Sequence, residues 1–198
     1  MGILLYFFRK NLNFFPRKKS LVLYANIWIF QNLILVISVG LRNYHYIHYY
    51  GLAYKRIGVI FFLIATLVGL ITLFIKIREA KTSFFLLRVN SWNAYALLIV
   101  MSLINWDVVI AKHNVHHDLK KNIDVEFLLT LSDKTLPIIA ANWERFDLED
   151  RYNYRFRQNY KSYLNNRIQH FIQRKESTTW KSWNYSEDKA YQYFKSRK

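Results

Sequence analysis

Cysteine is absent from this chain of 198 residues, and acidic side chains are scarce: 13 Asp and Glu face 29 Lys and Arg. Without cysteine, disulfide bonds and thiolate metal sites are excluded. Neither glycine nor proline occurs after Pro137, and no strand-like alternation is evident, so we expect an all-α fold. Residues 1–111 contain only two acids, Glu79 and Asp107, both at the edges of apolar runs. Proton-coupled pumps and intramembrane proteases normally place carboxylates inside such runs, which disfavours both classes.

Basic residues lie mainly at the ends of long apolar runs. Residues 1–111 hold 12 basic and 2 acidic residues, whereas residues 112–198 hold 17 and 11. Bases at the ends of apolar segments are typical of membrane insertion, while a nucleic-acid-binding protein more often concentrates them on one face. We therefore predict a lipid bilayer as a partner and expect no nucleic acid.

Three apolar segments, at about 21–41, 57–75 and 84–104, are predicted to be transmembrane helices. Segment 57–75 has no charge, and 14 of its 19 residues are Leu, Ile, Val or Phe. Its insertion is favoured by about 4–8 kcal/mol, and at about 1.5 Å per residue it spans a hydrocarbon core. Segment 84–104 is the weakest of the three predicted spans, because the Arg88 side chain must extend to the nearby end of the helix to reach water. We expect a basic amphipathic N-terminal segment at 1–20, a transmembrane region at 21–104 and a helical extramembrane tail at 105–198.

Polar and small residues inside these spans are candidates for contacts with other membrane helices, in this chain or in another subunit. Amides are costly in lipid and are expected to face other helices. Small residues at helical spacing let a second helix approach closely, although such residues are common in any membrane helix. The candidates are Asn26, Gln31, Asn32, Gly58, Ala65, Gly69, Thr72, Arg88, Asn90 and Asn93.

The segment between the first two spans, residues 42–56, contains five tyrosines, two histidines and flanking bases. Amphipathic rings suit the headgroup layer, and stacking on single-stranded nucleic acid is the alternative use of such a pattern. With three spans, the N-terminus and the loop between the second and third spans lie on one side of the membrane. That side carries eight bases, and the opposite side carries six. This difference leans toward a cytoplasmic N-terminus and an external tail, and a further span upstream would reverse it.

The tail shows helix signals. Asp124 can cap a short helix through Leu131, and Ser132 or Asp133 can cap the next. A last short helix is expected to begin near Ser186. Between them, an apolar residue at every fourth position predicts an amphipathic helix of about 28 residues that packs in a core or on the membrane. The stripe consists of Leu148, Tyr152, Phe156, Tyr160, Leu164, Ile168 and Ile172.

Three histidines follow the last span. They are His113, His116 and His117, with Asp107 and Asp118 nearby. On a continuous helix the histidines would share a face and could form a zinc-like site. However, the pattern His-Glu-x-x-His is absent, and asparagine, here at position 114, often ends a helix. In the simpler interpretation, Asp107 caps a short helix and the histidines lie in the wet headgroup layer. We assign no catalytic, cofactor or metal residue, and the candidate membrane–tail junction is Asn105, Asp107 and Asn114.

Four segments in order, "YYGLAYKR", "FLLRVNSWNAY", "NWDVVIAKHN" and "LLTLSDKTLP", resemble a bacterial family of multi-pass membrane proteins known only as a domain of unknown function. The resemblance extends roughly from Ser20 to the C-terminus. Because members of that family usually have further spans upstream, it implies that this chain corresponds to a C-terminal portion, in the bacterial inner membrane. It supplies no catalytic residue. The most specific positions are Tyr50, Gly51, Leu52, Arg56, Asn105, Asp107, Ile110, Ala111 and Asn114.

No nucleotide-binding loop, serine-hydrolase elbow or kinase motif is present in the sequence. We therefore expect a non-enzymatic multi-pass membrane protein that acts as a scaffold, a sensor-like protein or an accessory subunit, without a cofactor. A component of a transporter or permease is the alternative, with Arg88 and the amides along its pathway. A metal-dependent membrane hydrolase built on the histidines is a third hypothesis.

Overall fold

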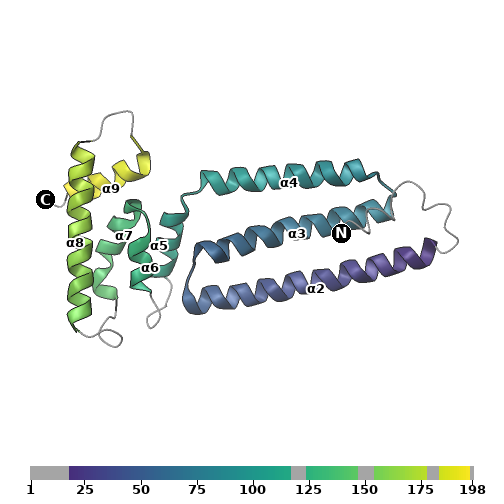
Figure 1. The fold of residues 1–198 in the computed structure, drawn as a ribbon, viewed down its shortest axis with the longest axis horizontal. Coiled ribbons are helices and arrows are strands. Elements are labelled where there is room, and N and C mark those ends of the chain that lie inside the picture. Colours follow the sequence, from purple (N-terminus) through teal and green to yellow (C-terminus); the bar gives the residue numbers. More distant parts are fainter. Residues whose placement is uncertain (1–17, 117–123, 147–153, 178–182, 197–198) are drawn as a thin grey trace. The chain divides into compact units, whose positions relative to one another are not determined.

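In a computed structural model of the protein, residues 18–116, 124–146, 154–177 and 183–196 are described, and every regular element among them is a helix (Figure 1). The chain divides into two compact units. The first comprises residues 1–46 and 55–104, and the second comprises residues 47–54 and 105–198. The predicted all-α class is confirmed.

Three long helices form the first unit. They are α2 (Lys18–Tyr50), whose last residues belong to the second unit, α3 (Tyr54–Arg78) and α4 (Ser83–Leu103). All three are long and apolar enough to cross a membrane, and each contains one predicted span. The middle helix is the most apolar and α4 the least, as the sequence predicts.

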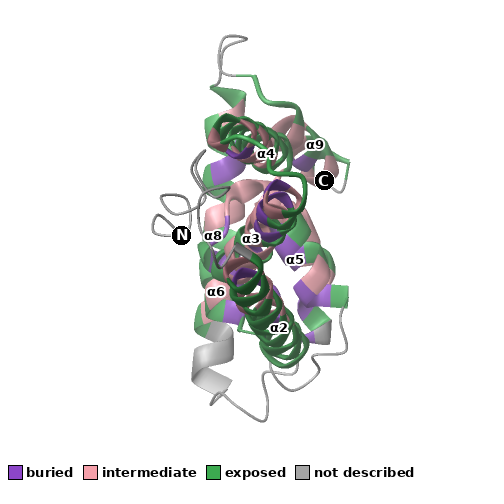
Figure 2. Cartoon of the chain, turned by 90° about the vertical axis from the view of Figure 1, so that its right-hand side faces the viewer, coloured by how far each residue is buried: buried purple, intermediate pink, exposed green. Residues whose placement is uncertain are grey.

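The first unit has a small core and a large exposed apolar surface. Ile29 of α2, Leu70 and Leu73 of α3, and Leu86 of α4 form a buried apolar cluster. In the most apolar windows of α2, α3 and α4, only 11%, 22% and 6% of the residues are buried by protein. Figure 2 shows exposed positions covering most of α2 and α4. Water-soluble proteins rarely expose apolar patches this extensive, so the surface suggests a membrane protein.

The first helix is longer than its predicted span. It continues nine residues beyond Leu41, through the tyrosine-rich segment, and ends at Tyr50. No glycine or proline interrupts residues 41–50, whereas the next residue, Gly51, has a φ of 75°. Glycine adopts this left-handed conformation without strain and commonly ends helices. Residues 51–53 alone connect α2 to α3.

A tight turn separates α3 from α4. Ala80 has a φ of 49°, and the Lys81 N–H donates to the Lys76 carbonyl at 3.1 Å, the bond that closes a Schellman helix end. Beside it, the Lys81 ammonium lies 2.8 Å from Glu79 and lowers the pKa of that exposed carboxyl. The Lys76 side chain is buried and its ammonium donates to Ser83 Oγ at 3.2 Å. This contact ties the end of α3 to the beginning of α4.

The described elements of the second unit are short, except for the 23-residue helix α8. They are α5 (Trp106–His116), α6 (Val125–Thr130), the 3-10 turns η2 (Asp133–Thr135) and η3 (Trp143–Arg145), α7 (Leu136–Ala141), α8 (Tyr154–Glu176) and α9 (Tyr185–Lys195). The Asp124 side chain accepts from Phe127 N–H at 2.9 Å, so its predicted capping role is confirmed. The last helix begins one residue before Ser186, as expected.

The amphipathic helix of the tail corresponds to α8. Of the predicted stripe, Leu164 and Ile172 are buried, and Tyr160 and Ile168 are half-buried. Phe171, outside the stripe, is more deeply buried than any of them. A spacing of four drifts around a helix of 3.6 residues per turn, so the buried face moves to positions 171 and 172 at its end. Leu148 and Tyr152 lie outside the described residues, and the same is true of the side chain of Phe156.

Candidate functional site at the junction of residues 51–54 and helix α5

The side chain of Asn114 binds both backbone polar groups of one residue in the 51–54 segment. Its Oδ1 accepts from Leu52 N–H at 2.6 Å, and its Nδ2 donates to the Leu52 carbonyl at 2.9 Å. Both residues are buried, at 6% and 9% exposure. A buried amide and carbonyl in a loop need partners, because leaving either one unpaired costs about 1–3 kcal/mol. One asparagine therefore completes the hydrogen bonding of a buried loop residue 62 positions away.

A second contact joins the same two segments. The Tyr54 hydroxyl donates to Asp107 Oδ1 in the first turn of α5. The predicted capping role of Asp107 is wrong, because the Asn105 carbonyl accepts from Val109 N–H at 3.2 Å and so occupies the cap position. The expectation that Asn114 ends the helix is also wrong. Helix α5 continues to His116, and Asn114 uses its side chain for the loop instead.

Apolar contacts surround these hydrogen bonds. Ile110 and Ala111 lie one turn before Asn114 on α5 and are completely buried. This helix packs against α7 and η2. Burial explains why an asparagine amide suits position 114, since a charged side chain there would be desolvated. At the junction, the buried polar groups of Leu52 and Asn114 are thus paired with each other.

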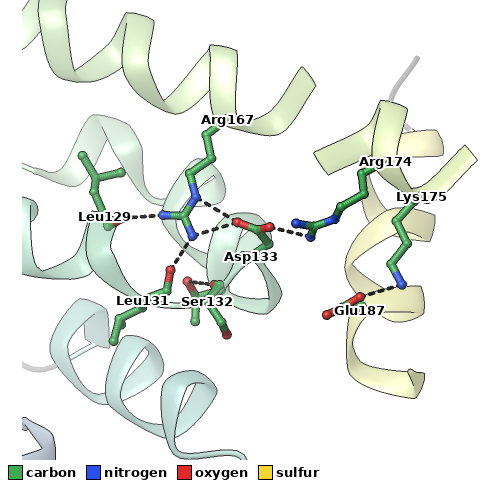
Figure 3. A network of polar contacts seen from close by, with 9 residues as sticks. Leu129, Leu131, Ser132, Asp133, Arg167, Arg174, Lys175 and Glu187 are labelled. Atoms are coloured by element: carbon green, nitrogen blue, oxygen red, sulfur yellow. Dashed lines mark hydrogen bonds and ion pairs between the residues drawn. The ribbon is translucent and has the colours of Figure 1, made fainter. Parts of the chain in front are cut away.

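A polar network joins α8 to η2 and to the residues before it (Figure 3). Arg167 of α8 donates from Nε to Asp133 Oδ1 at 2.8 Å, and its two terminal nitrogens donate to the carbonyls of Leu129 and Leu131. The planar guanidinium spreads its N–H donors over a rigid fork that reaches all three acceptors, whereas the donors of a lysine sit on one nitrogen. This side chain therefore holds α8 against the segment that follows α6.

Further ion pairs surround this arginine. Arg174 contacts Asp133 Oδ2 at 2.6 Å from the opposite side but is 58% exposed. Lys175, only 9% exposed, lies 2.6 Å from Glu187 and links α8 to α9. Exposed ion pairs contribute little, so Arg167 dominates the stabilising effect of this network.

The predicted helix–helix residues occupy different environments in the first unit. A Cβ atom added to Gly69 would lie 3.5 Å from Asn90 Oδ1, so α3 and α4 approach closely there. Gly58 faces open space, and Ala65 is half-buried. Asn32 and Asn90 donate to carbonyls of their own helices, and Thr72 does the same while buried. Arg88 and Gln31 are exposed, and Asn93 is half-buried. Asn26 is half-buried, and its buried Oδ1 has no hydrogen-bond partner in the part of the chain that the structure describes.

The histidines form no metal-binding group with the residues described. His113 and His116 both lie on α5, but His117 and Asp118 fall outside the described ranges. Among the described residues, no three His, Asp or Glu side chains are grouped closely enough to hold a metal ion. His116 Nδ1 instead lies 2.9 Å from the carbonyl of Lys112 on its own helix.

These observations fit a helical membrane protein of unknown activity. Residues 1–142 match the family described as Domain of unknown function (DUF4153), and the chain belongs to this family. The comparisons with curated proteins and with solved structures gave no match. The matched range begins earlier than the predicted resemblance and ends before α8. Asp133 lies inside this range, while its partner Arg167 lies beyond it.

The sequence predicts Asp107 and Asn114 at the junction, and Leu52 only through the family resemblance, but it pairs neither residue with its partner. Leu52 contributes only backbone groups to the Asn114 contact, and Tyr54 was one of several interfacial tyrosines. Arg167 lies outside the predicted apolar stripe, so the sequence pattern does not select it. Its position next to Ile168 and one turn after Leu164 places it at the edge of the apolar stripe, and this was the one available signal.

Proposed function

We propose that the protein is a non-enzymatic, multi-pass membrane subunit of the bacterial inner membrane that associates with at least one further transmembrane helix. Gln31 carries this proposal. Its side chain is exposed near the middle of α2, between the exposed Ile27 and Ile34, and makes no hydrogen bond to any described residue. An amide that faces lipid tails lacks hydrogen-bond partners, whereas an amide on a second helix satisfies it.

The polar side chains of the junction and of the tail are paired within the chain, and this supports a structural role. Asn114, Asp107, Asp133 and Arg167 are used in contacts between segments of the chain itself. A scaffold or accessory subunit requires such a stable tail and an apolar surface that other helices can recognise. The same surface would serve self-association or a different subunit.

Photo-cross-linking in the native membrane tests the proposal. A photoreactive phenylalanine derivative at Ile34, one turn from Gln31, should give one discrete protein adduct, whose mass identifies a second copy of the chain or another subunit. The same probe at Phe62, which is 69% exposed on α3, serves as the control and should react mainly with lipid. Gln31→Leu should reduce the Ile34 adduct several-fold, because the interhelical hydrogen bond is lost. Lipid adducts alone at Ile34 would refute the proposal.

A further inference from the structure

A cavity of about 450 Å³ lies between the beginning of α2 and the end of α3. Figure 1 shows these two helix ends at the same end of the first unit. The volume of the cavity falls within the range of about 300–1,000 Å³ that is usual for small-molecule sites. The cavity is lined by Val22, Asn26, Phe74, Ile77, Arg78 and Ala80.

Two polar groups of this cavity have unused hydrogen-bonding capacity. Asn26 Oδ1 is buried and accepts no hydrogen bond from the described residues, although a buried amide oxygen normally has a donor. Arg78 forms no ion pair with a described acid; Glu79 pairs with Lys81, and the charge of Arg78 acts on this carboxyl only as a further, smaller influence. One group therefore requires a hydroxyl or N–H donor, and the other favours an anion with several acceptor oxygens.

The surroundings indicate what kind of molecule carries both features. Val22, Phe74 and Ile77 provide an apolar wall, and the cavity lies where two membrane-spanning candidates end. Lys19, Lys76 and Lys81 add positive charge at this end, where Glu79 is the one acid among residues 18–26 and 74–83. Basic residues next to a span attract anionic lipids.

We infer that this cavity binds an anionic phospholipid whose headgroup carries a hydroxyl, such as phosphatidylglycerol. The phosphate accepts from the Arg78 guanidinium, and the headgroup hydroxyl donates to Asn26 Oδ1. The part of an acyl chain next to the headgroup contacts Val22, Phe74 and Ile77. This inference rests on the proposed membrane insertion but not on the partner helix at Gln31.

Native mass spectrometry of the full chain in detergent tests the inference, with phosphatidylglycerol and phosphatidylcholine as probes. The wild type should bind phosphatidylglycerol about tenfold more tightly, because phosphatidylcholine lacks both the net charge and the hydroxyl. Arg78→Gln should lower the phosphatidylglycerol affinity about tenfold, and Arg78→Lys should restore part of it, since lysine keeps the charge without the fork. Equal binding of the two lipids by the wild type would overturn the inference.

Two further variants separate a built site from general attraction. Lys19→Gln removes the same charge at the same end, but Lys19 is exposed and does not line the cavity, so its effect should stay below about twofold. Asn26→Leu keeps the side-chain size, removes the acceptor and should reduce the preference for phosphatidylglycerol, which keeps the test informative if Arg78 variants fold poorly. An equal loss in Lys19→Gln and Arg78→Gln would refute a specific site.

A competition experiment distinguishes the lipid from a soluble anion. Glycerol phosphate offers a phosphate and hydroxyls without acyl chains. In large molar excess it should leave bound phosphatidylglycerol in place, because it lacks the contacts with the apolar wall. Complete displacement would show a site for soluble phosphate esters and overturn the lipid assignment. A failed lipid preference would leave the cross-link at Ile34 unaffected, so the two proposals fail separately.

Discussion

Replacing Asn114 by alanine should release the 51–54 segment from α5. The substitution removes two buried hydrogen bonds, at 2.6 and 2.9 Å, and leaves the Leu52 N–H and carbonyl without partners. At about 1–3 kcal/mol for each unpaired buried group, we expect a local destabilisation of about 2–6 kcal/mol. Asn114→Asp keeps an acceptor but loses the donor and buries a carboxylate, so we expect a similar loss.

Hydrogen–deuterium exchange of the full chain in detergent measures this effect at the bond concerned. Because about 1.4 kcal/mol corresponds to a factor of ten, exchange of the Leu52 amide should accelerate at least about thirtyfold in Asn114→Ala. Asn166→Ala is the matched control, since Asn166 is exposed on α8 and loses the same atoms. Its exchange pattern around Leu52 should equal that of the wild type. An unchanged Leu52 exchange rate in Asn114→Ala would refute the conclusion that this asparagine holds the 51–54 segment on α5.

The remaining predictions concern the tail network, the α3–α4 turn and the transport alternative. Arg167→Ala should destabilise the tail by about 3 kcal/mol, but Arg174→Ala by less than about 1 kcal/mol, because Arg174 is largely exposed. Thermal unfolding followed by tryptophan fluorescence compares the two variants, and equal losses would contradict the dominant role of Arg167. Ala80→Gly should stabilise the protein by about 0.5 kcal/mol by relieving the positive φ, and a lower unfolding temperature would argue against strain there. In vesicles tested with a solute panel, Arg88→Ala and Asn90→Ala should leave solute flux unchanged; a flux that both variants abolish would favour a transporter.

Hydrophobic runs predicted the three long helices, because insertion depends on the summed apolarity of about 20 residues and not on any one of them. Local signals also predicted the Asp124 cap and the beginning of α9. The end of α2 was predicted less well, since lipid preference ends near Leu41 while the helix requires a residue such as Gly51 to stop it. Apolarity marks the membrane boundary, and backbone conformation marks the helix boundary.

Long-range polar contacts could not be predicted from the sequence. Periodicity reveals which face of a helix is apolar, but it does not identify the element that covers the face. Asn114 reaches a backbone whose side chain carries no signal, and Arg167 reaches two carbonyls in the same way. These contacts depend on tertiary structure, so the residues that matter most at the junction were found only in part.

The central claim is that three helices span the membrane. Labelling single introduced cysteines from each side of sealed vesicles tests it most directly, because the wild-type chain contains no cysteine. Glu79→Cys lies in the α3–α4 turn, Gln192→Cys on the exposed face of α9, and Phe62→Cys on the exposed face of α3. An impermeant maleimide should label positions 79 and 192 from opposite sides of sealed vesicles, because the single span α4 separates them, and should label position 62 only after solubilisation and denaturation. Labelling of positions 79 and 192 from the same side, or rapid labelling of position 62 in intact vesicles, would contradict the account.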